Sequence, residues 1–216
     1  MEVKLTNYTA APLNAIGAAA ANCYDSHTDH EKLANQCYNS GHTAVWEFCD
    51  FTFHIEGVSR ALLAQLTRHR IASYAVRSQR YVCESEPKYI IPTTILNNPP
   101  ALEEYRKVMK EYWDNYNKFV SLGVAPEDAR MLLPNACETI LEVKMNGRAL
   151  LHFMNERLCS RAQSEIRELA RRMKMEINKV APEFAEKCVP KCESGKVAYC
   201  PEHKSCGRHI TAKEIN

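Results

Sequence analysis

The chain contains 216 residues, and its 28 Lys and Arg nearly balance its 26 Asp and Glu to give a formal charge of +2. This length fits one domain, or one domain with a small appendage, and is sufficient to bury a core. The balanced charge excludes a protein that binds polyanions with its whole surface, so any anion site has to be local. The sequence contains neither a long apolar run nor a secretory signal pattern, and we therefore expect a soluble cytoplasmic protein.

The N-terminal residues predict a pair of helices. Residues 13–24 are rich in alanine, which favours a helix. A second helix follows, with Thr28 as its expected N-cap and Glu31 as the capping-box partner three residues later. Gly41 is expected to end this pair.

A strand and a short helix are expected next. Residues 48–55 alternate apolar and polar side chains, which is the pattern of a half-buried strand. Ser59 is a suitable cap for an amphipathic helix over residues 60–70. This helix would carry the basic triplet at residues 68–70 at its C-terminal end.

The rest of the chain predicts mainly helices. In chain order, the expected elements are an extended segment over residues 89–100, a long helix over 101–121, a short helix between Pro126 and Pro134, a strand over 139–146, and two helices between Asn146 and Pro182. The fold class is therefore α+β, with a central, mostly antiparallel sheet flanked by helices, long C-terminal helices and a Cys-rich tail. We expect a main domain over residues 1–187 and a tail over residues 188–216.

One basic stretch stands out. The segment "RHRIASYAVRSQRY" at residues 68–81 contains four arginines and a histidine. A solvated helix end explains its first part, because the C-terminal partial charge of a helix favours cations there. Arg77 and Arg80 with Ser78 between them, however, are suited to the bidentate binding of a phosphate. The neighbouring side chains are apolar or aromatic, which favours a pocket.

Two classes of function compete for this stretch. A nucleic-acid-binding protein would use the arginines against a phosphate backbone and Tyr74 and Tyr81 as stacking platforms. The near-neutral total charge argues against that class, so we favour a nucleotide or cofactor enzyme and expect no nucleic-acid partner. A nucleotide- or RNA-binding protein with a zinc-stabilised tail remains the alternative. Side chains able to read a base are Gln65, Thr67, Ser73, Ser78 and Gln79.

The stretch also contains Arg-His-Arg, seven residues, and then Ser, a pattern that resembles the signature of the flavin-dependent thymidylate synthases. Further segments resemble that family in order and spacing, so the resemblance covers most of residues 41–170. These segments are "GHTAVWEF" at 41–48, "ARMLLP" at 129–134 and "NGRALLHFMNERLCSRAQSEIRELA" at 146–170.

The resemblance implies a homotetramer with active sites at subunit interfaces. It also implies conversion of dUMP to dTMP, with 5,10-methylenetetrahydrofolate as carbon donor and FAD reduced by NADPH. The residues it assigns to dUMP are Gln65, Leu66, Thr67, Arg68, Arg77, Ser78, Gln79, Arg80, Arg130 and Arg157. Those assigned to FAD are Thr43, Arg68, His69, Arg70, Val76, Asn146, Arg148 and His152, while His42 and Glu47 line the folate and flavin region.

Arg157 is the expected catalytic residue. Hydride attack on a pyrimidine, or attack by its ring carbon on a methylene, builds negative charge that a fixed guanidinium stabilises without losing a proton. Ser78 is assigned to binding, because no activating base lies near it in the sequence. Val76 stands where many relatives have a glutamate. Gly147, His152, Glu156 and Arg161 also depart from the residues that are usual in the family.

Four cysteines lie close together in the sequence of the tail, namely Cys188, Cys192, Cys200 and Cys206. Two histidines lie near them in the sequence. Four thiolates suit a structural zinc ion, although their spacing is not that of the compact zinc signatures. Reduced thiols are the other interpretation, since disulfides are disfavoured in a cytoplasmic protein. We assign no metal ligand among the site residues.

Overall fold

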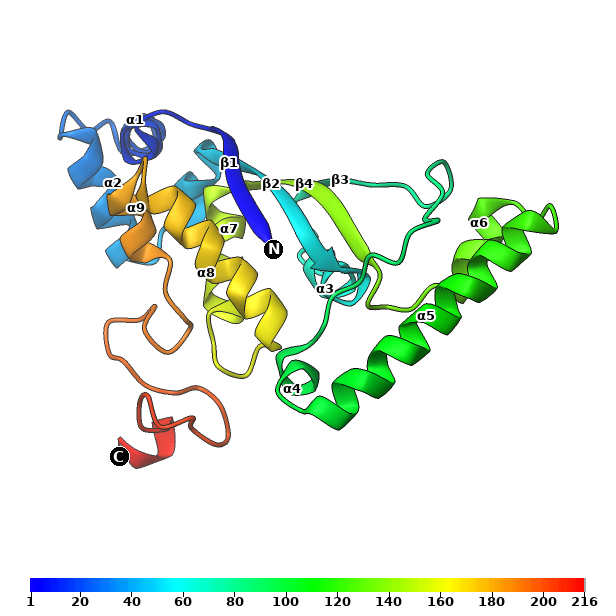
Figure 1. Cartoon of the computed structure of the whole chain (residues 1–216). Helices are drawn as coiled ribbons and strands as arrows, with labels where there is room; N and C mark the ends of the chain where they lie inside the picture. Colours follow the sequence, from blue (N-terminus) through cyan, green and yellow to red (C-terminus); the bar gives the residue numbers. More distant parts are fainter. Residues whose placement is uncertain (216) are drawn as a thin grey trace. The chain divides into compact units, whose positions relative to one another are not determined.

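The computed structural model describes residues 1–215, and its elements are labelled in Figure 1. The chain divides into two compact units. Unit 1 comprises residues 1–2, 55–68 and 75–141, and unit 2 comprises residues 3–54, 69–74 and those from 142 onward. The expected boundary between residues 187 and 188 is a different division and stays a prediction.

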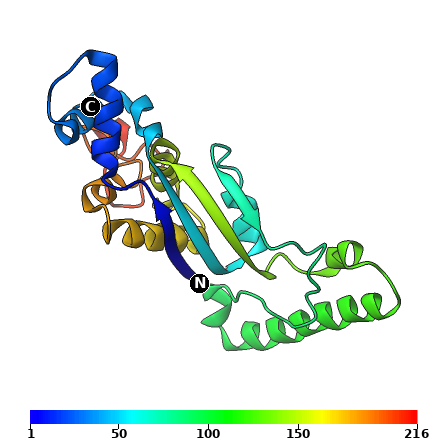
Figure 2. The same cartoon turned by 90° about the horizontal axis from the view of Figure 1, so that it is seen from above.

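Four antiparallel strands form one sheet in the order β1-β2-β4-β3. They are β1 (Glu2–Tyr8), β2 (Asp50–Ser59), β3 (Ser73–Val76) and β4 (Glu138–Asn146), and Figure 2 shows the same strands from above. Phe51, Phe53 and Ile55 of β2 are fully buried, as their alternation predicted. The α+β class with a mostly antiparallel sheet is confirmed. The two strands that sequence patterns did not predict, β1 and β3, are the edge strands.

The helical elements of unit 2 are α1 (Pro12–Tyr24), α2 (His30–Asn39), the 3-10 helix η1 (Thr43–Phe48), α7 (Gly147–Arg157), α8 (Ser164–Asn178), α9 (Pro182–Lys187) and the 3-10 helix η3 (Ala212–Glu214). Aromatic side chains from different elements meet in their core. The Phe184 ring lies 5.3 Å from that of Trp46 and 4.6 Å from that of Phe51, measured between centroids. This contact joins α9 to η1 and the sheet.

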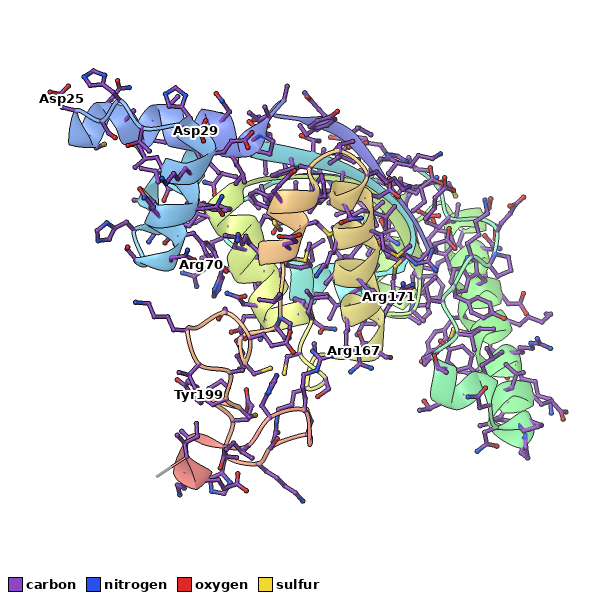
Figure 3. The ribbon with its side chains drawn as sticks, turned by 90° about the vertical axis from the view of Figure 1, so that its left-hand side faces the viewer. Asp25, Asp29, Arg70, Arg167, Arg171 and Tyr199 are labelled. Atoms are coloured by element: carbon purple, nitrogen blue, oxygen red, sulfur yellow. The ribbon has the colours of Figure 1, made fainter. Side chains whose placement is uncertain are left out.

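The start of α2 differs from the expectation. Asp29, labelled in Figure 3, is the N-cap, and its carboxylate accepts a hydrogen bond from the Lys32 N–H at 3.0 Å. Thr28 was therefore the wrong cap, and Glu31 is not its capping-box partner. An aspartate carboxylate is a strong acceptor for the N–H groups of a first helical turn, which explains the one-residue shift.

The helical elements of unit 1 are α3 (Arg60–Leu66), α4 (Thr93–Leu96), α5 (Pro99–Ser121), α6 (Pro126–Ala129) and the 3-10 helix η2 (Arg130–Leu132). The helix α5 buries Met109 and Trp113 against Cys137. Gly123 just beyond it has a φ of 87°, a left-handed conformation that ends the helix. None of the helices within residues 1–215 has the length and apolar composition that crossing a membrane requires.

Two expectations in unit 1 were wrong. The helix predicted over residues 60–70 ends at Leu66, where Thr67 acts as C-cap with its N–H bonded to the Leu63 carbonyl. The basic triplet therefore follows the helix, and the helix dipole does not account for its position. The segment 89–100 is not wholly extended, because its prolines flank the short α4 and open α5.

Candidate active site

Four of the predicted dUMP-binding arginines belong to unit 1, and two of them contact the same residue. The Arg80 Nε donates to a carboxylate oxygen of Glu127 at 2.8 Å, and the Arg130 Nε donates to the Glu127 carbonyl at 3.0 Å. Glu127 lies in α6, which Pro126 opens. The short helix thus brings together two guanidinium groups that are 50 residues apart in the sequence.

The loop after β3 presents its residues in different ways. Ser78 Oγ accepts the Arg80 N–H at 3.2 Å, an arrangement that fits a binding hydroxyl and not an activated nucleophile. The Arg77 N–H donates to the Ile140 carbonyl at 2.9 Å. The Gln79 side chain is buried and donates to Cys137 Sγ at 3.3 Å. A ligand can therefore meet the side chain of Arg77 but not its backbone N–H.

Arg60 is a basic residue of unit 1 that the sequence did not single out. Its guanidinium donates to the Arg77 carbonyl at 2.7 Å, while its Nε has no hydrogen-bond partner among residues 1–215. Burial lowers the pKa of Arg60, and the charges of Arg130 and Arg77 act in the same direction. An arginine in the first turn of α3 is unfavourable for the helix dipole, and this was the sequence signal that could have identified it.

In unit 2, Arg157 at the end of α7 is held by a histidine of the signature. Its Nε donates to His69 Nε2 at 3.0 Å. The His69 ring lies edge-on to Phe153 and His152, with centroids 5.1 Å and 5.7 Å away. Burial first, and the Arg157 charge second, lower the pKa of His69 to about 4. The imidazole is therefore neutral at pH 7, and its proton is on Nδ1 because Nε2 accepts.

The N-terminus of α7 holds two further predicted residues. Asn146 is the N-cap, and its amide oxygen accepts the Ala149 N–H at 2.8 Å, as the sequence predicted. Arg148, the second residue of the helix, forms an ion pair of 2.8 Å with Glu47 of η1. The structure thus brings together a residue predicted for flavin and one predicted for the folate and flavin region.

The predicted residues divide between the two units. Leu66 is fully buried, so only its backbone can meet a ligand. Unit 1 contains Gln65, Leu66, Thr67, Arg68, Val76, Arg77, Ser78, Gln79, Arg80 and Arg130. Unit 2 contains His42, Thr43, Glu47, His69, Arg70, Asn146, Arg148, His152 and Arg157.

Comparison with known proteins first defines the class. A family model described as thymidylate synthase complementing protein matches residues 4–183. The whole chain is 38% identical to the flavin-dependent thymidylate synthase of Clostridium tetani and covers 96% of that protein. Over 94% of its length it is 40% identical to the one from Pyrococcus furiosus, of which it covers 90%. The chain belongs to the family of flavin-dependent thymidylate synthases, as its arginine-rich signature predicted.

Solved structures agree with this assignment. The flavin-dependent thymidylate synthase ThyX of Helicobacter pylori, complexed with FAD and dUMP, is 27% identical with a TM-score of 0.69, and the match covers 88% of this chain and 100% of that one. A UMP/dUMP methylase, PolB of Streptomyces cacaoi bound with 5-Br dUMP, is 22% identical with a TM-score of 0.76, covering 86% and 93%. The second similarity concerns the fold alone.

Proposed function

We propose that this protein converts dUMP to dTMP, with 5,10-methylenetetrahydrofolate as carbon donor and FAD reduced by NADPH as hydride source. Family membership over the full chain supports the reaction, and a ThyX of the same family is complexed with FAD and dUMP. The observation that carries the proposal furthest is the Arg157 guanidinium fixed by the neutral His69 ring.

Arg157 is the proposed catalytic residue. Because the His69 ring accepts from its Nε, the guanidinium has a defined orientation. A cation fixed in this way stabilises negative charge on a pyrimidine ring as that charge develops, and no reorganisation is needed at that moment. Arginine suits the role, because it keeps its proton at every pH at which the protein is folded.

The residues of unit 2 fit a flavin nucleotide by their chemistry. Arg70 and Arg148 offer cations to a diphosphate, and His69 offers a neutral ring. We propose that these residues hold FAD together with Arg68, Val76 and Thr43, Asn146 and His152, and that His42 and Glu47 line the folate and flavin region. FAD, when bound, supplies the hydride chemistry, and the protein supplies position and charge.

The arginines of unit 1 are the proposed phosphate site of dUMP. Arg80 and Arg130 both meet Glu127, and Ser78 lies on the same loop as Arg80. A phosphate would compete with the Glu127 carboxylate for the Arg80 guanidinium and accept from the Ser78 hydroxyl. Arg77 and Arg68 would complete the charge, with Gln65, Leu66, Thr67 and Gln79 around the nucleotide.

The assembly and location are also proposals. We infer a homotetramer with active sites at its subunit interfaces, because large apolar side chains such as Tyr81 and Met131 are more than 80% exposed in the single chain. A cytoplasmic location is consistent with ten cysteines in a chain without disulfides among its described residues. Nucleic acid and membranes are not proposed as partners.

The experiment is a spectroscopic titration of the purified protein. We expect a flavin absorption spectrum that dUMP perturbs, and turnover to dTMP when the folate and NADPH are added. Arg157→Ala should keep the fold and the flavin and lower turnover by about 10²-fold or more, the usual cost of a lost transition-state donor.

Two further variants sharpen this test. Arg157→Lys keeps a positive charge but loses the Nε that binds His69, so we expect most of the activity to be lost there too. Arg106→Ala, at an exposed position of α5, is the matched control and should retain activity. A protein that cannot be reconstituted with FAD, or an Arg157→Ala variant with full turnover, would contradict the proposal.

A further inference from the structure

The C-terminal tail after α9 is ordered by its backbone. The Tyr199 N–H donates to the Cys192 carbonyl at 3.1 Å, and the Cys200 N–H donates to the Ile210 carbonyl at 2.7 Å. A parallel bridge joins Cys200 and Thr211. These bonds place the chain around Cys192, Cys200 and His209 side by side.

The tail has little apolar interior to hold it in this form. Val197 is 64% exposed and Ile210 is 53% exposed. The 3-10 helix η3 is its one helix within the described residues. Short segments that cannot bury a core generally depend on a cross-link or a metal ion for a defined structure.

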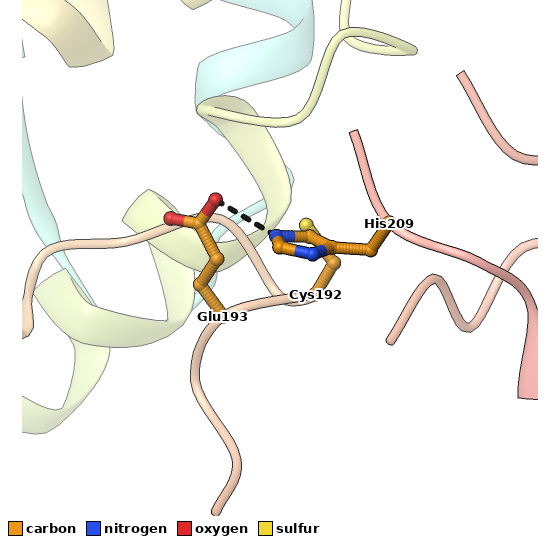
Figure 4. Close-up of side chains that lie close together, drawn as sticks. All are labelled: Cys192, Glu193 and His209. Atoms are coloured by element: carbon orange, nitrogen blue, oxygen red, sulfur yellow. Dashed lines mark hydrogen bonds and ion pairs between the residues drawn. The ribbon is translucent and has the colours of Figure 1, made fainter. Parts of the chain in front are cut away.

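Metal-binding groups meet in this part of the chain. The side chains of Cys192, Glu193 and His209 bring their ligand atoms within 4.8 Å of one another (Figure 4). The His209 Nε2 lies 3.2 Å from a carboxylate oxygen of Glu193. Among residues 1–215 this is the one group of its kind.

A cavity of about 210 Å³ adjoins the group and is lined by more thiols. We call it the tail cavity. Its lining includes Cys159, Cys192, Cys200, Cys206 and His209. Arg167 of α8, labelled in Figure 3, also lines it. Three of these thiols come from the tail and the fourth, Cys159, from the loop after α7.

Cys188 does not belong to this set. It is fully buried, and its thiol faces the Phe184 carbonyl at 3.7 Å in the core of unit 2. The four crowded cysteines of the sequence are therefore not one cluster. Cys159, 29 residues before Cys188, lines the tail cavity, whereas Cys188 does not line it.

We propose that Cys192 and His209 bind a structural zinc ion, with two thiolates from Cys159, Cys200 and Cys206 completing its coordination. Thiolate and imidazole ligands together select zinc over the hard cations, and four protein ligands make a closed site without a reactive position. Glu193 orients the His209 ring through Nε2, which leaves Nδ1 for the metal. This site is independent of the proposed flavin chemistry.

The first test is the metal content of the full chain, purified under reducing conditions. Elemental analysis should find one zinc ion per chain. Replacement by Co²⁺ should give the absorption bands of a tetrahedral cobalt thiolate. Removal of the metal by a chelator should unfold the tail, so that trypsin cleaves faster after its exposed Lys196 and Lys204 while the flavin spectrum persists.

Variants identify the ligands. Cys192→Ser and His209→Ala should each lose zinc, and Glu193→Gln should weaken zinc binding by about 10- to 100-fold, as is usual for a residue that orients a ligand. Cys23→Ser, an exposed thiol of α1, is the matched control and should keep the full zinc content. Absorbance of bound flavin in the same samples separates a failure of this proposal from a failure of the proposed reaction.

Three results would overturn the proposal. One is a protein that contains no zinc and gives no cobalt thiolate bands on reconstitution. Another is a disulfide between two cysteines of the tail cavity in the reduced preparation. The third is a Cys192→Ser variant with unchanged zinc content.

Discussion

At the scale of single residues, His69 works as a neutral acceptor in a cationic neighbourhood. Its ring is packed edge-on against Phe153 and receives the Nε–H of Arg157. Its backbone is held as well, because the Tyr74 hydroxyl donates to the His69 carbonyl at 2.7 Å. A protonated ring would lose the bond to Arg157 and place two positive charges in contact, so the arrangement requires the neutral form.

We predict that His69 titrates near pH 4, against an ordinary pKa of 6.5. Since the folded-state pKa is the lower one, the unfolded chain takes up this proton first as the pH falls. The loss of stability therefore accumulates as the pH falls from 6.5 to about 4, stays at its full value below that range and is absent above it. NMR of the imidazole shifts against pH measures the midpoint.

The Arg157→Ala variant separates the Arg157 charge from burial, the largest of the three causes of this shift, the third being the His152 charge. We expect the His69 pKa to rise in the variant without reaching 6.5, because burial is the larger cause and remains. The difference between the free energies of unfolding at pH 7 and at pH 5 should become smaller accordingly. A wild-type midpoint at the ordinary value would show that the ring is not desolvated.

At the scale of elements, the junction between β4 and α7 is tightly constrained by its close packing. Asn146 is both the last residue of the strand and the cap of the helix. Gly147 follows, and its N–H donates to the Cys49 carbonyl at 2.8 Å. A Cβ at this position would lie 2.5 Å from Cys49 Sγ and 2.7 Å from the Trp46 carbonyl. Only glycine permits this close approach.

We predict that Gly147→Ala destabilises the protein by roughly 1–3 kcal/mol, the usual range for overpacking against atoms that cannot move. Gly195→Ala is the control, because its Cβ would meet the Val197 carbonyl at an ordinary 3.6 Å. That variant should stay within about 0.5 kcal/mol of the wild type. Urea unfolding of both variants provides the measurement, and equal midpoints would refute the steric argument.

How far the sequence predicts the structure depends on whether a signal is local. The long helix α5 and the strand β4 have strong periodicity and were predicted within two residues of their observed ends. The edge strand β3 was missed because it has only four residues, too few to establish a period, and none of them is buried.

The same distinction applies to the site. The residue types of the signature were predictable, because the motif is contiguous. Cys159 was not, because it reaches the tail cavity only through folding. Arg60 gave one local signal, its unfavourable place in the first turn of α3, but its bond to the Arg77 carbonyl also depends on folding. The spacing of these residues in the sequence therefore does not predict either contact.

At the scale of the whole molecule, the signature segment belongs to both compact units. Arg68 lies in unit 1, residues 69–74 in unit 2, and residues from 75 onward again in unit 1. Large apolar side chains are exposed in each unit, including Phe48 of η1 at 67% and Met131 of η2 at 81%. Exposed side chains of this kind on a folded chain are typical of surfaces that other subunits cover.

We predict that sedimentation gives the protein a mass four times the 24.6 kDa of one chain. Phe48→Asp and Met131→Asp should lower the assembly state, because each would bury a carboxylate in an interface. Val197→Asp is the control, since this exposed side chain lies beyond the residues that the family model matches. Light scattering distinguishes the species, and a wild-type protein of 24.6 kDa would contradict the tetramer.

Glu127 has a consequence for which anions this protein retains. Its carboxylate occupies the Arg80 guanidinium, and its carbonyl occupies Arg130. An incoming monoanion such as chloride or acetate would replace one single negative charge by another, so its binding would gain little free energy. A phosphate monoester carries nearly twice that charge at neutral pH, so it can outcompete the resident carboxylate. At the proposed phosphate site, this counter-ion would therefore favour the scarcer doubly charged ester over abundant cellular monoanions.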